Sequence, residues 1–266
     1  MPEKNLLTVE HISKSFGGLK AVSDISFVVP YGKIISIIGP NGAGKTSVFN
    51  LLTGVYQVDR GSIRLEGQEL CGLKPYDLIG TGIARTFQNL RLFSDLTVLE
   101  NVMIGYQCNI RYSFLDAALR TPKRNAGELD ALAHAQDILE KIGLSHLSGI
   151  ICKNLPYGQQ KMVEIARAMV SGAKLLLLDE PAAGLNPGET EELSSFIQKL
   201  VTWGYSVLLI EHDMNLIMNI SDYIYVMNYG TLLASGLPKE IQTNEEVISA
   251  YIGRGGVQRV IKSRKS

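Results

Sequence analysis

Residues 39–46 read GPNGAGKT, which fits the pattern G-x-x-x-x-G-K-[ST]. Glycines at this spacing let consecutive main-chain N–H groups converge on phosphate oxygens, and a following helix adds the positive end of its dipole. Lys45 then reaches the β- and γ-phosphates, and the Thr46 hydroxyl is a ligand for Mg²⁺. A plain glycine-rich turn is the alternative, but the apolar run IISII directly before the loop favours a nucleoside triphosphate site. The residues expected to form it are Gly39, Pro40, Asn41, Gly42, Ala43, Gly44, Lys45, Thr46 and Ser47.

A pair of acidic residues ends the apolar run LLLLDE at residues 175–180. A short continuous apolar run is typical of a strand buried on both faces, and α/β folds bind ligands at the carboxyl ends of such strands. Asp179 would hold Mg²⁺ through water, and Glu180 would act as general base on the attacking water. A strand followed by a solvated acidic turn is the alternative, and the phosphate-binding loop favours the catalytic interpretation.

The elements that must position these residues alternate between strand and helix. Strands are predicted at 7–10, 25–29, 33–39, 62–65, 174–179 and 206–210. Helices are predicted at 46–52, 160–170 and 188–203, and the helix at 160–170 has its apolar side at Met162, Val163, Ala166, Met169 and Val170. This alternation indicates a mostly parallel sheet with helices on its faces. Between residues 88 and 154 helix formers dominate, and the helix predicted at 130–142 ends at Gly143, so we expect an inserted helical lobe.

Composition excludes several classes of protein. With 45% hydrophobic residues the 266-residue chain can bury a core, which excludes low-complexity disorder. The 26 basic and 26 acidic residues cancel, which argues against nucleic acid as a partner. No apolar run is long enough to span a bilayer, and MPEKNLLTVE does not resemble a signal peptide, so we expect a cytoplasmic chain. The three dispersed cysteines predict reduced thiols, with neither a disulfide nor a zinc site.

Residues 155–159, LPYGQ, directly precede the helix predicted at 160–170. At this point the chain resembles the ATP-binding subunits of ABC transporters, whose signature is usually LSGGQ. The resemblance runs from about residue 6 to residue 252, and includes Gln88 in RTFQ as the Q-loop glutamine and His212 in LLIEHDM as the switch histidine. It implies an α/β fold: a P-loop NTPase (RecA-like) core with an N-terminal antiparallel β subdomain and an inserted α-helical subdomain.

The resemblance also implies roles for individual residues. In that family two subunits enclose two ATP molecules, and each signature helix caps the γ-phosphate bound by its partner, which places Gly158 and Gln159 on the partner's nucleotide. His212 would contact the γ-phosphate, and Gln88 would contact Mg²⁺ or its water and couple the site to the membrane subunit. Phe16 falls where an aromatic ring stacks on adenine, and a packed core phenylalanine is the alternative. The groove for the membrane subunit would lie near Arg85, Leu90, Arg91, Leu92 and Phe93.

The chain departs from the family pattern at three positions. Pro156 stands where the signature has serine, and it offers neither a hydroxyl nor an N–H group. Tyr157 replaces the first signature glycine, and Asn186 stands where many members have aspartate. The contact with the partner's phosphate would then rest on main-chain donors around Gly158 and on the helix dipole.

With these departures, the chain resembles one branch of the family. LPYGQQ, EPAAGLNP, RTFQNLRLF and the closing AYIG resemble the Liv-type ATPases of branched-chain amino acid importers, and the expanded segment 107–127 resembles the longer, G-type subunit. The implied ligands are ATP and Mg²⁺. The implied partners are integral-membrane permease subunits, a second ATPase subunit (identical or paralogous) and, indirectly, an external substrate-binding protein. The implied location is peripheral, at the cytoplasmic face of the inner membrane, with a chain that is soluble when isolated.

The expected domains are a core with its β subdomain (1–87 and 160–253), the helical subdomain (88–159) and a basic tail (254–266), either frayed or in contact with anionic lipid. Alternatives stay open for the function. Related ATPases serve urea or other amino acid and amide import, and lipopolysaccharide export. A soluble ABC ATPase of DNA repair or translation is disfavoured by the single cassette, and a P-loop GTPase or kinase by the absence of N-K-x-D. A regulatory subunit without turnover is disfavoured by Lys45, Glu180 and His212.

Overall fold

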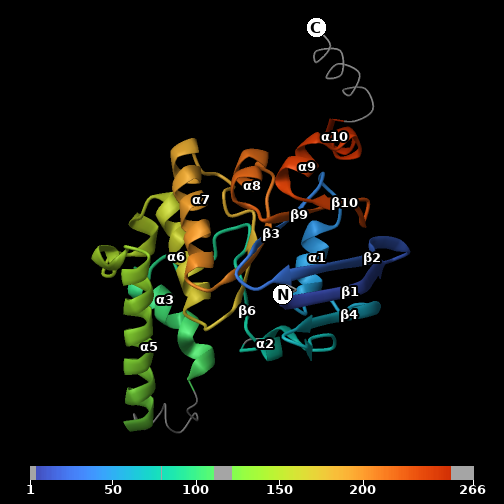
Figure 1. Cartoon of the computed structure of the whole chain (residues 1–266). Coiled ribbons are helices and arrows are strands. Elements are labelled where there is room, and N and C mark those ends of the chain that lie inside the picture. Colours follow the sequence, from blue (N-terminus) through green and yellow to red (C-terminus); the bar gives the residue numbers. More distant parts are fainter. Residues whose placement is uncertain (1–3, 79, 111–121, 253–266) are drawn as a thin grey trace.

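A computed structural model describes residues 4–78, 80–110 and 122–252 of the chain. Two sheets lie on one side of the molecule and a group of helices on the other (Figure 1). The antiparallel sheet has the order β2–β1–β4–β5 and contains β1 (Asn5–Phe16), β2 (Leu19–Pro30), β4 (Arg60–Leu65) and β5 (Gln68–Glu69).

The second sheet is parallel except for its last pair, β9 and β10, and has the order β10–β9–β3–β8–β7–β6. Its strands are β3 (Ile34–Ile38), β6 (Ile83–Arg85), β7 (Leu175–Asp179), β8 (Ser206–Ile210), β9 (Tyr223–Asn228) and β10 (Thr231–Gly236). Every residue of β3, β7 and β8 is buried, as their continuous apolar runs predict for strands covered on both faces.

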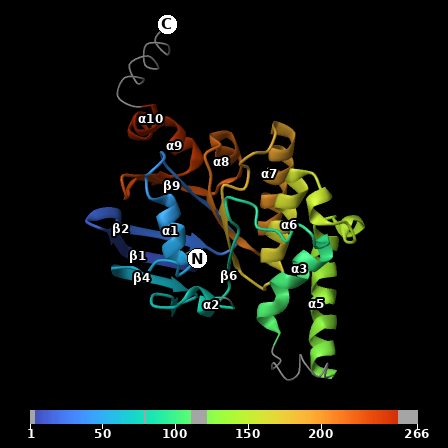
Figure 2. The ribbon, with the colours of Figure 1, turned by 180° about the vertical axis from the view of Figure 1, so that it is seen from behind.

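Helices cover this second sheet and form the lobe beside it, as the reverse view shows (Figure 2). They are α1 (Lys45–Leu52), α2 (Pro75–Leu78), α3 (Val98–Tyr106), α5 (Pro122–Lys141), α6 (Tyr157–Met169), α7 (Pro187–Thr202), α8 (Met214–Ile220), α9 (Pro238–Thr243) and α10 (Glu245–Ile252). Three short 3₁₀ turns lie at Gln107–Asn109, Ser145–Leu147 and Cys152–Asn154. No helix within the described ranges has the length and apolar character needed to cross a membrane.

The expected fold class is confirmed: a P-loop NTPase core carries an antiparallel β subdomain and an inserted helical lobe. The helix expected at 130–142 is longer, since α5 begins at Pro122 and ends at Lys141. Residues 111–121 of the expanded segment, and the basic tail at 254–266, lie outside the described residues.

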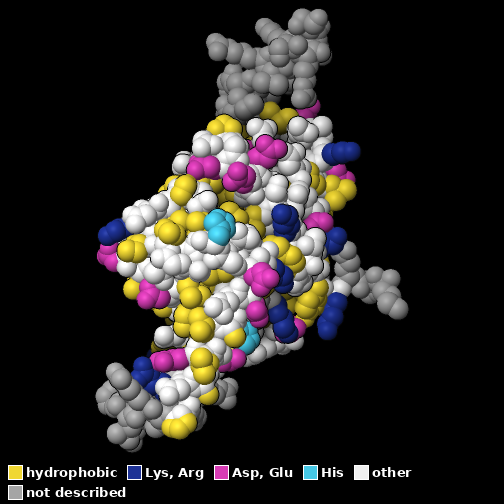
Figure 3. All heavy atoms as spheres, turned by 90° about the vertical axis from the view of Figure 1, so that its left-hand side faces the viewer, with side chains coloured by type: hydrophobic (Ala, Val, Ile, Leu, Met, Phe, Trp, Pro, Cys, Tyr) yellow, Lys and Arg dark blue, Asp and Glu magenta, His cyan; other side chains and the backbone are white. Residues whose placement is uncertain are grey.

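Of the three hydrophobic clusters among the described residues, two hold the layers together. One lies between the antiparallel sheet, α1 and one face of the parallel sheet, and the other joins the opposite face of that sheet to α3, α5, α6 and α7. The second cluster therefore crosses the expected boundary between residues 159 and 160, which falls inside α6. On the helical face both signs of charge are mixed with hydrophobic side chains, in keeping with a net charge of zero (Figure 3).

Candidate nucleotide site

The loop between β3 and α1 requires glycine at two positions. Gly39 has φ +154°, and a Cβ there would lie 2.2 Å from the main-chain oxygen of Met227. Gly44 has φ +101°, and a Cβ there would lie 2.5 Å from the main-chain oxygen of Ala21. Because L side chains are disfavoured at positive φ and neighbouring main chain fills the space, only glycine lets the loop pass this close to its neighbours.

Lys45 begins α1 and its side chain turns back over the loop. It is 6% exposed, and its Nζ donates to the main-chain oxygens of Gly39 at 2.7 Å and Pro40 at 3.1 Å. Burial lowers the pKa of this ammonium, and the nearby carboxylates of Glu180 and Asp179 act in the opposite direction. The loop's own carbonyls thus orient the ammonium group next to the pocket.

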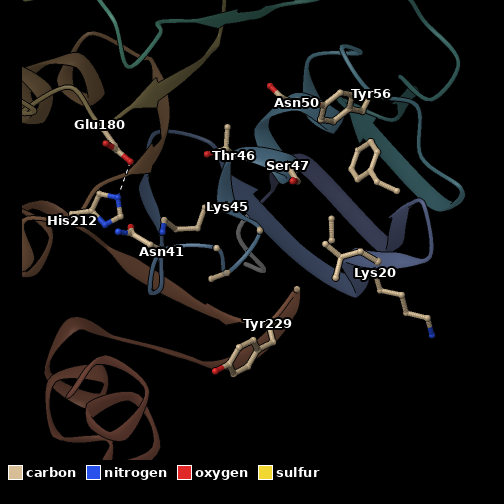
Figure 4. Close-up of a pocket in the computed structure, with 17 residues that line it drawn as sticks. Lys20, Asn41, Lys45, Thr46, Ser47, Asn50, Tyr56, Glu180, His212 and Tyr229 are labelled. Carbon is tan, nitrogen blue, oxygen red and sulfur yellow. Dashed lines mark hydrogen bonds and ion pairs between the residues drawn. The ribbon is translucent and has the colours of Figure 1, made fainter. Parts of the chain in front are cut away.

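The pocket beside the loop has a volume of about 600 Å³, within the range of small-molecule sites. Lys45 and Thr46 lie between a Glu180–His212 pair at one end and Tyr56 at the other (Figure 4). The expected residues that line it are Phe16, Asn41, Gly42, Ala43, Gly44, Lys45, Thr46, Ser47, Glu180 and His212. The other expected residues are not among its lining residues: Gly39, Pro40, Gln88, Gly158, Gln159 and Asp179.

Glu180 stands directly after β7, and both of its carboxylate oxygens are engaged. Nε2 of His212 lies 2.7 Å from Oε1, and Nε2 of Gln88 donates to Oε2 at 2.7 Å. Since a carboxylate only accepts, the imidazole carries its proton on Nε2 in this contact. The main chain of Glu180 has φ +48°, an uncommon conformation for a residue with a side chain. Three segments that are far apart in sequence therefore meet at one carboxylate.

Glu211 was not singled out from the sequence, although it fixes two of these segments. The side chain is 3% exposed, and its oxygens accept from the main-chain N–H groups of Ala182 and His212, both at 2.7 Å. Burial raises the pKa of this carboxyl, and the main-chain donors oppose that change. The signal in the sequence that could have identified Glu211 was its position between a fully apolar strand and His212.

Asp179 is paired with Arg85, which the sequence analysis had placed near the groove for the membrane subunit. Nη2 of Arg85 lies 2.7 Å from Oδ2 of Asp179, and Nη1 donates to Oδ1 of Asn50 at 2.7 Å. The guanidinium faces the rings of Phe49 and Phe87. Arg85 does line the apolar groove between the core and the helical lobe, but its charged group turns inward.

Of the five residues expected near that groove, Arg85 and Phe93 line it. Leu90, Arg91 and Leu92 are not among its lining residues, and Leu92 packs on the helical cluster instead. The remaining lining is mostly apolar and includes Val55, Leu78, Ile83, Phe87, Ile104 and Ala168.

The signature segment begins α6, with Pro156 at the N-cap and no side chain capping the helix. The ring of Tyr157 covers Gly184, whose φ is +83° and whose Cβ would lie 3.3 Å from Cε1 of the ring. Asn186 caps α7 through a hydrogen bond from the main chain of Glu189. The aspartate-to-asparagine departure therefore keeps a good N-cap.

Phe16 ends β1 and is 39% exposed, so the alternative of a packed core residue is wrong. Its ring meets Tyr56 edge-on with a centroid distance of 4.9 Å. Tyr56 was missed because it stands in a loop, outside any motif. The two rings form an aromatic wall at the end of the pocket opposite Glu180.

Comparison with known proteins gives the same result as the geometry. A family described as "ABC transporter" matches residues 22–183, which is more than half of the chain. The chain belongs to the ABC transporter ATPase family. A second family, "Branched-chain amino acid ATP-binding cassette transporter", matches residues 231–257, of which the described part contains β10, α9 and α10.

Several named relatives of this ABC ATPase extend over most of its length. The high-affinity branched-chain amino acid transport ATP-binding protein BraF of Pseudomonas aeruginosa is 45% identical over 93% of this chain and 98% of its own. The protein LivG of Escherichia coli, named for the same transport, is 46% identical with the same coverage.

Solved structures of ABC ATPases share the fold. A nucleotide-free ATP-binding cassette from an ABC transporter has a TM-score of 0.82 and 35% identity, and covers 94% of this chain and 100% of that one. The ADP conformation of an ATP-binding cassette gives the same TM-score and identity, with 99% of that chain covered. Nucleotide binding and ATP hydrolysis are therefore properties of this ABC ATPase.

Proposed function

We propose that the chain drives import of branched-chain amino acids as the ATP-hydrolysing subunit of an ABC importer. The meeting of Lys45, Glu180 and His212 in one pocket supports the ATPase part of this proposal. The match of residues 231–257 and the names of BraF and LivG support the substrate class.

The phosphate-binding loop holds the triphosphate by its main-chain N–H groups and by the start of α1. Lys45 neutralises charge on the β- and γ-phosphates, and residues 39–47 form the cradle. Phe16 stacks on the adenine ring with Tyr56 behind it, which is supported by the exposure of one face of the aromatic wall. Catalysis here is mainly positioning and charge stabilisation.

Glu180 takes a proton from the attacking water, and His212 contacts the γ-phosphate. The hydrogen bonds from His212 and Gln88 to the two oxygens of Glu180 support these roles because they hold the carboxylate at the phosphate end of the pocket, which Glu180 and His212 line. Water attacks the γ-phosphorus directly, so ADP and phosphate leave without a covalent enzyme intermediate.

The residues present fit a Mg²⁺ ion. Thr46 lines the pocket, Asp179 ends β7, and hydroxyl, carboxylate and amide oxygens suit this ion. No group of three or more His, Cys, Asp or Glu residues that could hold a metal ion occurs in the part of the chain that the structure describes. Thr46, Asp179 and Gln88 would hold Mg²⁺, which supplies neutralisation of developing phosphate charge when bound.

The partners follow from the same arrangement. Two ATPase subunits, identical or paralogous, close over two nucleotides, and Gly158 and Gln159 at the start of α6 face the nucleotide of the partner. The N-terminus of α6, which no side chain caps, supports that role because it can face an anion. The apolar groove between core and lobe receives an integral-membrane permease subunit, and the complex works at the cytoplasmic face of the membrane with an external binding protein.

The transport proposal is tested by uptake in cells that lack the chain. We expect uptake of labelled leucine, isoleucine and valine to be lost, to return with the wild-type chain, and not to return with Lys45→Ala. Urea uptake serves as the control and should not change. Loss of urea uptake with normal leucine uptake would contradict the substrate class while leaving the ATPase intact.

Gln88→Ala should lower transport more than it lowers ATP hydrolysis. The side chain reaches Glu180 from the segment that joins the core to the helical lobe, so its loss weakens the link between the two. We expect kcat of the purified chain to fall about 3- to 10-fold, and amino acid transported per ATP in proteoliposomes to fall further. Equal losses in both measurements would contradict the coupling role.

A further inference from the structure

Three charged residues on α6 face inward, although helix periodicity predicts them to be solvated. They are Lys161, Glu164 and Arg167, spaced by three residues along one side of the helix, and we refer to them as the charge row. Lys161 and Glu164 are each 2% exposed, and the Arg167 side chain is 18% exposed. Charges are rarely buried without partners, so the contacts of this row need an explanation.

All three residues of the charge row bind the main chain of the Q-loop. Nζ of Lys161 donates to the main-chain oxygen of Gln88 at 3.1 Å. The carboxylate of Glu164 accepts from the main-chain N–H of Arg91 at 3.2 Å and also from that of Phe87. Nη1 of Arg167 donates to the main-chain oxygen of Arg91 at 2.6 Å. The helix that starts at the signature therefore grips the segment 87–91 by its backbone.

The charge row also has neighbours outside the backbone of the segment. The Lys161 ammonium lies 5.6 Å from the centroid of the Tyr157 ring and is attracted by the carboxylates of Glu164 and Glu211. Burial lowers the pKa of Lys161 and raises that of Glu164, and each group's charge opposes the shift of the other. Hydrogen bonds to charged groups are about twice as strong as neutral ones, so three of them fix the segment firmly.

We propose that the charge row positions Gln88 for its contact with Glu180. This inference rests on the proposed role of Gln88 at Glu180. The amide of Gln88 reaches Glu180 only while its main chain stays docked on α6. The charge row consists of positioning residues, because none of them lines the nucleotide pocket.

The test uses the full-length chain with Lys161→Met, Gln88→Ala and the double variant. We expect Lys161→Met to speed amide exchange across residues 87–93 about 10-fold and to lower kcat by the same factor as Gln88→Ala, with KM for ATP unchanged. The double variant should be no slower than either single variant, because both changes remove one contact. Lys161→Arg keeps the charge and should restore both measurements.

The matched control is Lys153→Met, which removes an exposed lysine of the same lobe that is paired with Asp95. It should leave exchange at 87–93 and kcat at wild-type values. If Lys161→Met does not fold, Arg167→Met removes another contact of the charge row from a less buried position, and the same comparison with Gln88→Ala applies.

Two results would overturn the proposal. Losses in kcat that multiply in the double variant would mean that Lys161 acts independently of Gln88, and so would wild-type exchange in Lys161→Met. A Gln88→Ala variant with wild-type kcat would instead remove the role of Gln88 at Glu180, and the positioning proposal with it. The Gln88→Ala arm alone identifies which of the two has failed.

Discussion

Glu180→Gln is expected to lower the rate of ATP hydrolysis by about 10²–10⁴-fold without preventing ATP binding. The substitution keeps the shape of the side chain. Its amide oxygen can still accept from Gln88, and its NH₂ group can donate to Nε2 of His212 once the imidazole carries its proton on Nδ1 instead. What it loses is the ability to take a proton from water, so the change isolates the basicity of this side chain.

The rate is measured as steady-state release of phosphate, and the assembly by size-exclusion chromatography with Mg·ATP. We expect the variant to accumulate as an ATP-bound dimer because hydrolysis no longer reopens it. Glu191→Gln, at an exposed position of α7, is the matched control and should behave as wild type. Turnover close to wild type in Glu180→Gln would refute the general-base role.

Lys45→Ala is expected to abolish ATP binding at concentrations that saturate the wild-type chain. The substitution removes the buried ammonium, and the main-chain oxygens of Gly39 and Pro40 lose their donor. Truncating one partner of a buried charged contact costs about 2–5 kcal/mol, which is roughly 30- to 5,000-fold in affinity.

Affinity is measured by titration with a fluorescent ATP analogue, and folding is checked by circular dichroism. Lys174→Ala is the control. This lysine is exposed and pairs with Glu66, and it stands just before the first residue of β7, whereas Asp179 is the last. An unchanged affinity in Lys45→Ala would contradict the phosphate-binding role of the loop.

The sequence predicted best the parts of the fold that depend on local pattern. β3, β7 and β8 are short apolar runs between turn residues, and their bounds agree with the structure to within a residue. Helix α1 could be predicted because the phosphate-binding loop is followed by a helix. By contrast, the start of α5 was missed, because residues 122–129 (PKRNAGEL) include a proline and a glycine and carry no apolar period of their own.

The candidate site was predictable as a set of motifs but not as a set of contacts. Nothing in one sequence shows that Gln88, Glu180 and His212 meet, since the sheet order that joins them is not a local property. Arg85 was expected at the groove because it stands beside the Q-loop, and its pairing with Asp179 depends on the register of β6 and β7. The charge row was missed for a related reason: a charged stripe normally marks a solvated face.

The engagement of both Glu180 oxygens has a consequence for the direction from which water can attack. Each carboxylate oxygen has about two acceptor sites, so each oxygen keeps one site open beside its contact with His212 or Gln88. A water molecule that donates to Glu180 must therefore use one of the remaining sites. We expect the two neighbours to narrow the angle of attack, as an in-line displacement at phosphorus requires.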